Sequence, residues 1–276
     1  MQAAGCVPGT EADAERIPPA VAAHAIATYT HPGDLVLDPD CGTGTVLTEA
    51  LRAGRHALGL TTNNRWWTVA RANLTAAKSA GAWRDGSVLD ARPKVLATAR
   101  AVGLTGRVGL VLTALRTTSN NPNSPDHDPV ESAAQLATTL RCCEPLLRAG
   151  GHVVVIAQPH RRSDGSLVDL TTQLIAAGTA AGLTPVHRCV ALTAELRGDR
   201  LITRASLVER RAARATVSPA LLAAHHEVLV FQLAHDAELA AANAIDTSPV
   251  ADDGSGFRVT QPSCPEEQRQ EATHAC

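Results

Sequence analysis

The sequence is poor in aromatic residues and in long apolar runs, and each shortage excludes a class of protein. Its 276 residues include only two phenylalanines, three tryptophans and one tyrosine. A protein that stacks several bases on aromatic platforms is therefore disfavoured. No apolar run approaches the roughly 20 residues of a membrane-spanning helix, and the first residues show no basic stretch followed by an apolar core. We therefore expect no membrane contact and a cytoplasmic location.

Charge and cysteine content exclude further classes. The net charge of −2 creates no overall field that would attract nucleic acid or an anionic membrane. Two of the 25 basic residues are lysines and the rest are arginines, a bias that codon usage explains more simply than selection for phosphate contacts. The seven cysteines form no C-x-x-C pair and have no histidines at zinc-finger spacing. The sequence predicts neither a disulfide framework nor a metal site.

Short apolar runs alternate with longer segments of helical composition, a pattern typical of parallel strands joined by helices. Most of the runs before residue 157 are continuous rather than alternating, as in strands that are covered on both faces. The final two runs admit an antiparallel pair. The expected strands are 34–39, 56–61, 86–91, 108–113, 152–157, 183–192 and 227–233. The expected helices are 18–29, 44–54, 64–80, 92–102, 129–148, 167–181 and 219–225.

The two ends of the chain differ in composition from its centre. Residues 1–16 are predicted to be a disordered N-terminus, and residues 17–234 to form one domain. Residues 235–276 are predicted to be a helical extension and a disordered tail, because their later part is polar and rich in Gly, Pro and Ser.

The turn after the first expected strand is the most informative segment. The apolar run ends in DPDCGTGT, residues 38–45, and a helical segment follows. Glycines at positions 42 and 44 allow the backbone to approach a ligand closely, and the new helix directs unpaired N–H groups toward it. The pattern indicates a ligand site at the carboxyl end of a strand.

This turn resembles motif I of S-adenosylmethionine-dependent methyltransferases, in the form found in DNA amino-methyltransferases and the related tRNA-guanine methyltransferases. The preceding segment PPAVAAHAIATYTHPGD (18–34) resembles motif X of the same group. LRCCEPLLRAGGHVVVI (140–156) resembles the helix, Gly-Gly turn and fifth strand of class I methyltransferases, and HEVLVFQ (226–232) resembles their closing strand. The resemblance implies a class I methyltransferase fold: a Rossmann-like, doubly wound α/β sheet, mostly parallel with an antiparallel last strand.

The resemblance also implies S-adenosylmethionine as cofactor and a set of residues around it. Asp90 corresponds to the carboxylate that accepts from the adenine amino group, although a solvated carboxylate at a strand end is an equally good interpretation. Thr61 stands where the family usually has an acid that binds the ribose. The other expected cofactor-binding residues are Thr28 and Tyr29 from motif X and Asp38, Cys41, Gly42, Thr43 and Gly44 from motif I.

The fourth expected strand departs from the family. There the family carries D/N/S-P-P-Y/F, whose polar groups accept from the target amine and whose aromatic ring stacks on the flipped base. This chain has Ala114-Leu115-Arg116-Thr117 instead. Thr113 and Thr117 are the remaining candidates for a catalytic acceptor, and Asn121-Pro122 is a shifted substitute.

The resemblance leads to one main functional hypothesis and two alternatives. The main hypothesis is a methyltransferase acting on an exocyclic amine of a DNA or RNA base. One alternative is an inactive relative that serves as a binding or regulatory module, with an active methyltransferase as partner, and the other is a small-molecule methyltransferase. A nucleic acid would contact an arginine-rich segment that is equally well interpreted as a solvated hairpin. Its arginines are Arg197, Arg200, Arg204, Arg210 and Arg211.

Overall fold

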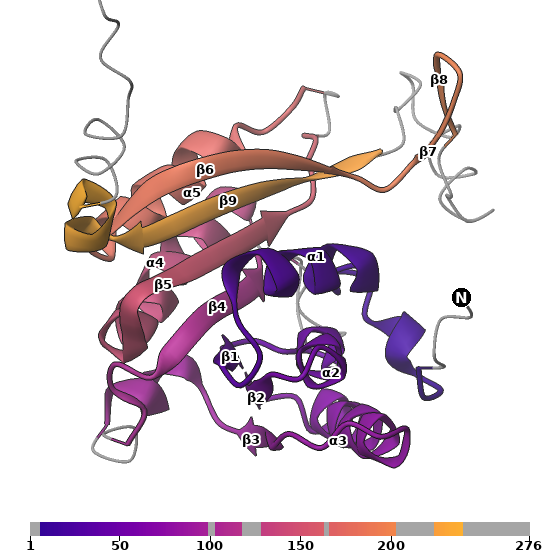
Figure 1. Ribbon diagram of the computed structural model, residues 1–276. Helices are drawn as coiled ribbons and strands as arrows, with labels where there is room; N and C mark the ends of the chain where they lie inside the picture. The colour runs from indigo at the N-terminus through magenta and orange to yellow at the C-terminus, as the bar shows by residue number, and fades with distance from the viewer. Residues whose placement is uncertain (1–5, 99–102, 118–127, 163–165, 203–223, 240–276) are drawn as a thin grey trace, which may run out of the picture.

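A computed structural model describes residues 6–98, 103–117, 128–162, 166–202 and 224–239 (Figure 1). Several expected features lie outside these residues. They are Asn121-Pro122, the arginines Arg204, Arg210 and Arg211, residues 1–5, the tail from 240, and parts of the expected helices 92–102 and 219–225.

Seven strands form one sheet, and all seven expected strands are present in it. The sheet order is β3-β2-β1-β4-β5-β9-β6. β9 runs antiparallel to both of its neighbours, and the other pairings are parallel. The predicted fold class, a doubly wound and mostly parallel α/β sheet with an antiparallel last strand, is confirmed. The strands are β1 (Leu35–Asp38), β2 (His56–Thr61), β3 (Gly86–Asp90), β4 (Val108–Ala114), β5 (Leu147–Ala157), β6 (Leu183–Leu192) and β9 (His225–Leu233).

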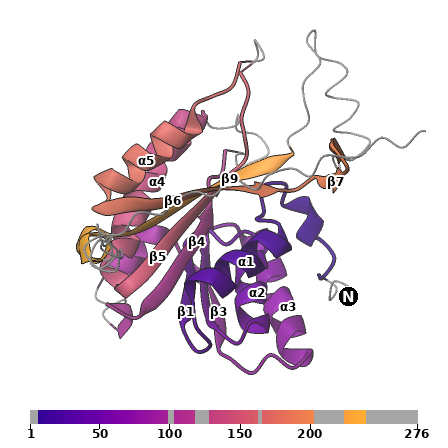
Figure 2. The ribbon, with the colours of Figure 1, turned by 45° about the horizontal axis from the view of Figure 1, so that its top comes forward.

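Helices cover both faces of the sheet, which explains why the central strands are continuously apolar (Figure 2). In β4, Leu110 and Leu112 pack into one core with α1, α2 and α3, whereas Val111 packs into the other with α4 and α5. No helix in the described part of the chain has the length and apolar character needed to cross a bilayer. The helices are α1 (Pro19–Tyr29), α2 (Thr45–Arg52), α3 (Asn64–Ser79), α4 (Pro129–Cys143) and α5 (Leu170–Ala180).

Helix ends differ from the prediction where local chemistry stops them. The helix expected to run to 148 ends at Cys143, and after a short 3-10 turn that contains Pro145, β5 begins at Leu147. Leu147 pairs with Val108 of β4 and His152 pairs with Leu110, so residues 148–151 form an irregularity within β5. The Gly-Gly segment that was expected as a turn lies there, and Gly150 has a φ of 70°. Of the helix expected at 92–102, the described residues contain only a 3-10 turn, Pro93–Ala97.

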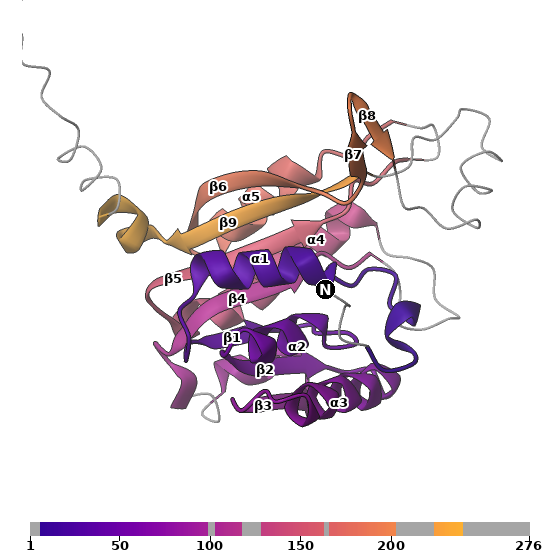
Figure 3. The same cartoon turned by 45° about the vertical axis from the view of Figure 1, so that its right-hand side comes forward.

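The N-terminal segment, residues 6–16, is folded against the sheet, so the expected disorder of residues 1–16 is wrong for this part. The segment contains a 3-10 turn at Thr10–Ala12 and continues into α1 (Figure 3). The side-chain amide of Asn73 on α3 donates to Thr10 Oγ1 at 2.9 Å, and its oxygen accepts from the Val7 N–H at 3.0 Å. A buried amide on a neighbouring helix thus supplies partners that the local sequence does not reveal.

Two smaller features complete the fold. β7 (Glu195–Arg197) and β8 (Arg200–Ile202) form an exposed hairpin. Residues 234–239 are helical.

We predict that Gly178→Ala destabilises the protein. Gly178 lies in α5 directly against the Phe231 ring of β9, and an added Cβ would overlap that ring. Overpacking of this kind costs about 1–3 kcal/mol, more than the helix gains from alanine. Urea denaturation measures the loss, and Gly103→Ala, where a Cβ meets open space, is the control. Equal stability of the two variants would contradict the packing described here.

Candidate functional site

The candidate site lies at the carboxyl ends of β1 and β4, where the order of the sheet reverses direction. From β1 the chain adds β2 and β3 on one side, while β4, β5 and the remaining strands lie on the other. Ligands of open α/β sheets bind at such a switch point. The turn 38–45 leaves β1 here, and residues 115–117 leave β4 beside it.

The two glycines of the turn serve different purposes. Both have positive φ, 48° for Gly42 and 81° for Gly44. A Cβ on Gly44 would lie 2.9 Å from the Ala70 Cβ of α3, so this glycine allows two helices to pack closely. A Cβ on Gly42 would collide with the Arg116 guanidinium and the Asp13 carboxylate. Of the two, Gly42 is therefore the glycine whose Cα faces the cleft, where Arg116 and Asp13 lie against it.

An ion pair fills the space above Gly42. Arg116 Nη1 and Nη2 donate to the two Asp13 carboxylate oxygens at 2.8 and 3.1 Å, a bidentate geometry. The same carboxylate accepts from the Thr43 N–H at 3.2 Å and from the Thr43 hydroxyl at 3.4 Å. The side chains of Asp13 and Arg116 are only 2% and 12% exposed. The ion pair thus joins the N-terminal segment, the glycine turn and the end of β4.

The carboxyl groups around Arg116 differ in their protonation. Burial works to raise the pKa of Asp13, but hydrogen bonding and the charge of Arg116 outweigh it, so this pKa lies below its ordinary value. Burial raises the pKa of Asp38 to about 7, against the attraction of Arg116 and with a contribution from Asp40. Asp38 also accepts from the Asp40 N–H at 3.1 Å. Near neutral pH this buried carboxyl is poised between its two forms.

Little room is left in the cleft itself. The cavity bounded by Asp38, Cys41 and Arg116 has a volume of about 10 Å³, enough for one water at most. A nucleoside cofactor does not fit beside Gly42 while Asp13 and Arg116 occupy that space. The donor groups of Thr43 and Arg116 nevertheless suit a carboxylate, because they already bind the carboxylate of Asp13.

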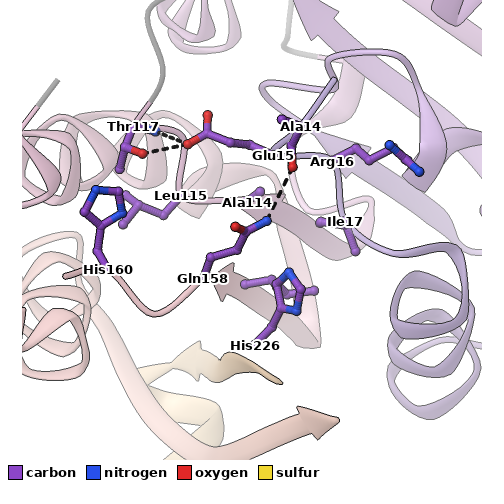
Figure 4. A pocket seen from close by; sticks show the side chains of 11 residues that line it. Ala14, Glu15, Arg16, Ile17, Ala114, Leu115, Thr117, Gln158, His160 and His226 are labelled. Atoms are coloured by element: carbon purple, nitrogen blue, oxygen red, sulfur yellow. Dashed lines mark hydrogen bonds between the residues drawn. The ribbon is translucent and has the colours of Figure 1, made fainter. Parts of the chain in front are cut away.

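A larger cavity adjoins the cleft at the ends of β4 and β5 (Figure 4). Its volume is about 190 Å³. The N–H and hydroxyl of Thr117 donate to Glu15 Oε1 at 2.8 and 2.6 Å, and Gln158 Nε2 donates to the Ala14 carbonyl at 3.4 Å. The N-terminal segment therefore forms one wall. The lining residues are Ala14, Glu15, Arg16, Ile17, Ala114, Leu115, Thr117, Ile156, Gln158, His160 and His226.

His226 is the chemically notable residue of this cavity. Both of its ring nitrogens are buried, and neither has a hydrogen-bond partner among the described residues. Burial, with a contribution from neighbouring His225, lowers the pKa of its imidazole. The ring is therefore neutral near pH 7 and able to accept a proton. It also borders a wider cavity of about 700 Å³ beside α1 and the end of β6.

The structure brings most of the expected cofactor residues to this edge of the sheet. Asp38, Cys41, Gly42, Thr43 and Gly44 form the turn itself. At the end of β2, Thr61 is buried and its hydroxyl accepts from the Asn63 N–H at 3.3 Å. Asp90 is exposed and pairs in register with Thr61.

Thr28 and Tyr29 do not reach the turn, which corrects the expectation from motif X. Ile17, just before α1, lines the cleft, and an 11-residue helix extends about 16 Å from that point. Both residues therefore lie at its far end. The Tyr29 hydroxyl lies 3.3 Å from His187 Nδ1, and the Thr28 hydroxyl donates to the carbonyl of its own helix at His24.

The two threonines that were expected to be catalytic acceptors are not positioned for that role. Thr113 is 1% exposed within β4, so it cannot touch a substrate. Thr117 borders the larger cavity, but its hydroxyl donates to Glu15. In the arginine-rich segment, Arg197 pairs with Glu195 at 2.9 Å on the exposed β7/β8 hairpin, which also carries Arg200.

Sequence reasoning missed Asp13, Glu15 and Arg116. Arg116 carried a usable signal, because it follows the strand that neighbours β1 and must lie beside the glycine turn. Asp13 and Glu15 carried none, since they belong to a polar stretch whose folding depends on distant partners.

Comparison with known proteins supports the resemblance described above. Residues 11–71 match the sequence profile of a family described as DNA methylase. This region contains the glycine turn and ends before β4. No curated protein matches the chain in sequence.

Solved methyltransferase structures are similar to the chain at low identity. A precorrin-6y C5,15-methyltransferase from Geobacter metallireducens has 12% identity and a TM-score of 0.47, over 83% of this chain and 91% of its own. Geranyl diphosphate C-methyltransferase from Streptomyces coelicolor has 14% identity and a TM-score of 0.48, over 76% and 78%. A TehB-like S-adenosylmethionine-dependent methyltransferase from Corynebacterium glutamicum has 16% identity and a TM-score of 0.44, over 77% and 86%.

We predict that Arg116→Met destabilises the protein by about 3 kcal/mol or more, because it leaves the Asp13 carboxylate buried without its partner. Arg197→Met is the matched control. Its ion pair is on the surface, where the arginine side chain is 66% exposed, and its loss costs under about 1 kcal/mol. Chemical denaturation compares the two, and losses of similar size would contradict the structural role of the Arg116 pair.

We predict that Asp38 makes stability fall as pH rises from about 4 to about 7. In this window the folded protein keeps a proton on Asp38 that the unfolded chain releases, since the pKa rises from 3.8 to about 7 on folding. The stabilisation is complete below pH 4, and the loss amounts to something on the order of 4 kcal/mol. Asp38→Asn should flatten the profile of unfolding free energy against pH. The same change at Asp85, whose side chain is 92% exposed, should leave the slope as it is, and a flattening there as large as at Asp38 would refute the prediction.

Proposed function

We propose that the protein is an S-adenosylmethionine-dependent methyltransferase whose cofactor binds at the switch point between β1 and β4. The observation that carries the proposal is the turn 38–45, with the bare backbone of Gly42 at the carboxyl end of a central parallel strand. The match of residues 11–71 to the DNA methylase profile supports it independently.

The chain's own groups define what the site does around that cofactor. S-adenosylmethionine supplies an electrophilic methyl group when it is bound. The turn residues Asp38 and Thr43 offer an acceptor and donors for its polar parts. The adjoining cavity at the ends of β4 and β5 holds the acceptor next to the methyl group.

We propose a compact polar acceptor for the cavity at the ends of β4 and β5. A volume of about 190 Å³ accommodates a small molecule or its reacting end. The described lining has no Phe, Tyr or Trp on which a flipped base would stack. His226 lines this cavity with a neutral imidazole, which can take a proton from an attacking hydroxyl or amine once the ring turns one of its buried nitrogens toward the cavity.

A second candidate acceptor is an exocyclic amine of a DNA or RNA base. The family profile favours it, since that profile is described as DNA methylase. The end of β4 argues against it, because Leu115 is buried and Arg116 is directed to Asp13, where the family has acceptors for the amine. An inactive regulatory relative is favoured only by the filled cleft beside Gly42.

Two successive measurements test the proposal. Isothermal titration with S-adenosylhomocysteine should show one site per chain, and absence of binding would refute the methyltransferase assignment. Transfer of a tritiated methyl group is then followed onto DNA, total RNA and a metabolite extract. Label in the metabolite fraction alone supports the compact acceptor, whereas label in nucleic acid establishes the second candidate.

We predict that His226→Gln lowers the rate of methyl transfer at pH 7 by about a hundredfold or more, the usual contribution of a positioned base. Affinity for S-adenosylhomocysteine should stay unchanged, because the imidazole belongs to the acceptor cavity. The control is His31→Gln, whose side chain is 87% exposed. If the His226 variant keeps the full rate, the imidazole is not the base.

A further inference from the structure

Asp13 occupies a set of converging donors that is built for a carboxylate. One side of the set is the Thr43 backbone N–H together with the Thr43 hydroxyl, and the other is the two-pronged guanidinium of Arg116. Planar, bidentate contact with an arginine is the preferred geometry of a carboxylate. The donors come from the glycine turn after β1 and from the residues that follow β4, so the set does not belong to the segment that now fills it.

The surroundings make this set selective for one directed anion. Asp38 and Asp40 also act electrostatically on Arg116, whose Nε is 3.6 Å from the Asp40 carboxylate. A general positive field is therefore absent, and an anion is held only where the Arg116 and Thr43 donors point. Acidic groups beside a carboxylate-binding set also suit a ligand that carries an ammonium group next to its carboxylate.

The segment that supplies Asp13 is held mainly by polar contacts. Residues 6–16 contribute no buried apolar side chain, and their buried residues are Thr10 and Asp13. Asn73 and Thr117 hold the segment through side-chain hydrogen bonds at 2.6–3.0 Å. Opening of this segment breaks the Asp13–Arg116 ion pair and the polar contacts but exposes no fully buried apolar side chain, and a ligand carboxylate on Arg116 replaces the ion pair.

We infer that Arg116 and Thr43 form the subsite for the α-carboxylate of the methyl donor's amino-acid part, and that Asp13 occupies it as an internal competitor. The inference rests on the proposed function and deepens it. The donor binds only when residues 6–16 leave the cleft. Ala14 and Glu15 leave with them, so the wall of the acceptor cavity opens in the same movement.

The test compares two nucleosides that differ in the amino-acid part. S-adenosylhomocysteine carries the carboxylate, and 5′-methylthioadenosine lacks the whole amino-acid group. Asp13→Asn should tighten S-adenosylhomocysteine binding by about tenfold, and the gain for methylthioadenosine should be clearly smaller. Arg116→Lys keeps the positive charge but loses the bidentate N–H donors of the guanidinium. It should therefore weaken the binding of S-adenosylhomocysteine more than that of methylthioadenosine. The control is Glu11→Gln, an exposed carboxylate of the same segment that accepts from the Gly9 N–H and should change neither affinity.

Hydrogen–deuterium exchange on the unmodified protein provides a readout that needs no variant to fold. Saturating S-adenosylhomocysteine should speed amide exchange in residues 7–16 and slow it in the glycine turn. Unchanged or slower exchange in residues 7–16 would overturn the role of Asp13 as an internal competitor. An equal change in the affinities of both nucleosides on Asp13→Asn would do the same, and either result would leave the methyltransferase proposal intact. Failure of every variant to bind either nucleoside would overturn both.

Discussion

The buried ion pair between Arg116 and Asp13 is the interaction on which the site depends. It connects three segments that are remote in sequence: the N-terminal segment, the glycine turn and the end of β4. A buried guanidinium without a partner is strongly destabilising, so its position follows the carboxylates around it. Two of those, Asp38 and Asp40, belong to the turn, and Arg116 Nε also donates to the Asp40 carbonyl at 3.2 Å. In our proposal Asp13 is the exchangeable member of the group.

This arrangement separates what is permanent in the site from what is conditional. The β-strand ends, Gly42 and Thr43 are fixed by the sheet, and the close contact between Gly44 and Ala70 fixes the helix that follows. The contacts of residues 6–16 are polar, and they close both the cleft and one side of the larger cavity. In our proposal the cofactor and acceptor compartments therefore share one movable wall, so that binding in the first controls access to the second.

The sequence was sufficient for the sheet but not for the cleft. Continuous apolar runs such as HVVVIA identified strands because burial on both faces requires them, and Pro145 explains where the prediction of one long helix failed. The motif X resemblance placed Thr28 and Tyr29 at the cofactor, yet the direction of α1 carries them to its far end. Asp13 could not be predicted, because its environment is created by residues 30 and 103 positions away in the chain. Local patterns report burial and periodicity, whereas a polar cluster depends on tertiary contacts.

The replacement at the end of β4 also bears on the acceptor. An amine that attacks a methyl group needs hydrogen-bond acceptors for its N–H groups, which orient the lone pair. At this position the chain has an arginine, which has five donors and no acceptor. The change therefore reverses the hydrogen-bonding character of the strand end. Acceptors, which would bind an amine, are replaced by the donors of Arg116, which bind a carboxylate. The retained glycine turn and the altered β4 end are then consistent with each other, because both face the amino-acid part of the proposed donor. In our proposal, recognition of the acceptor passes to the neighbouring cavity, which is lined by His226 and Gln158.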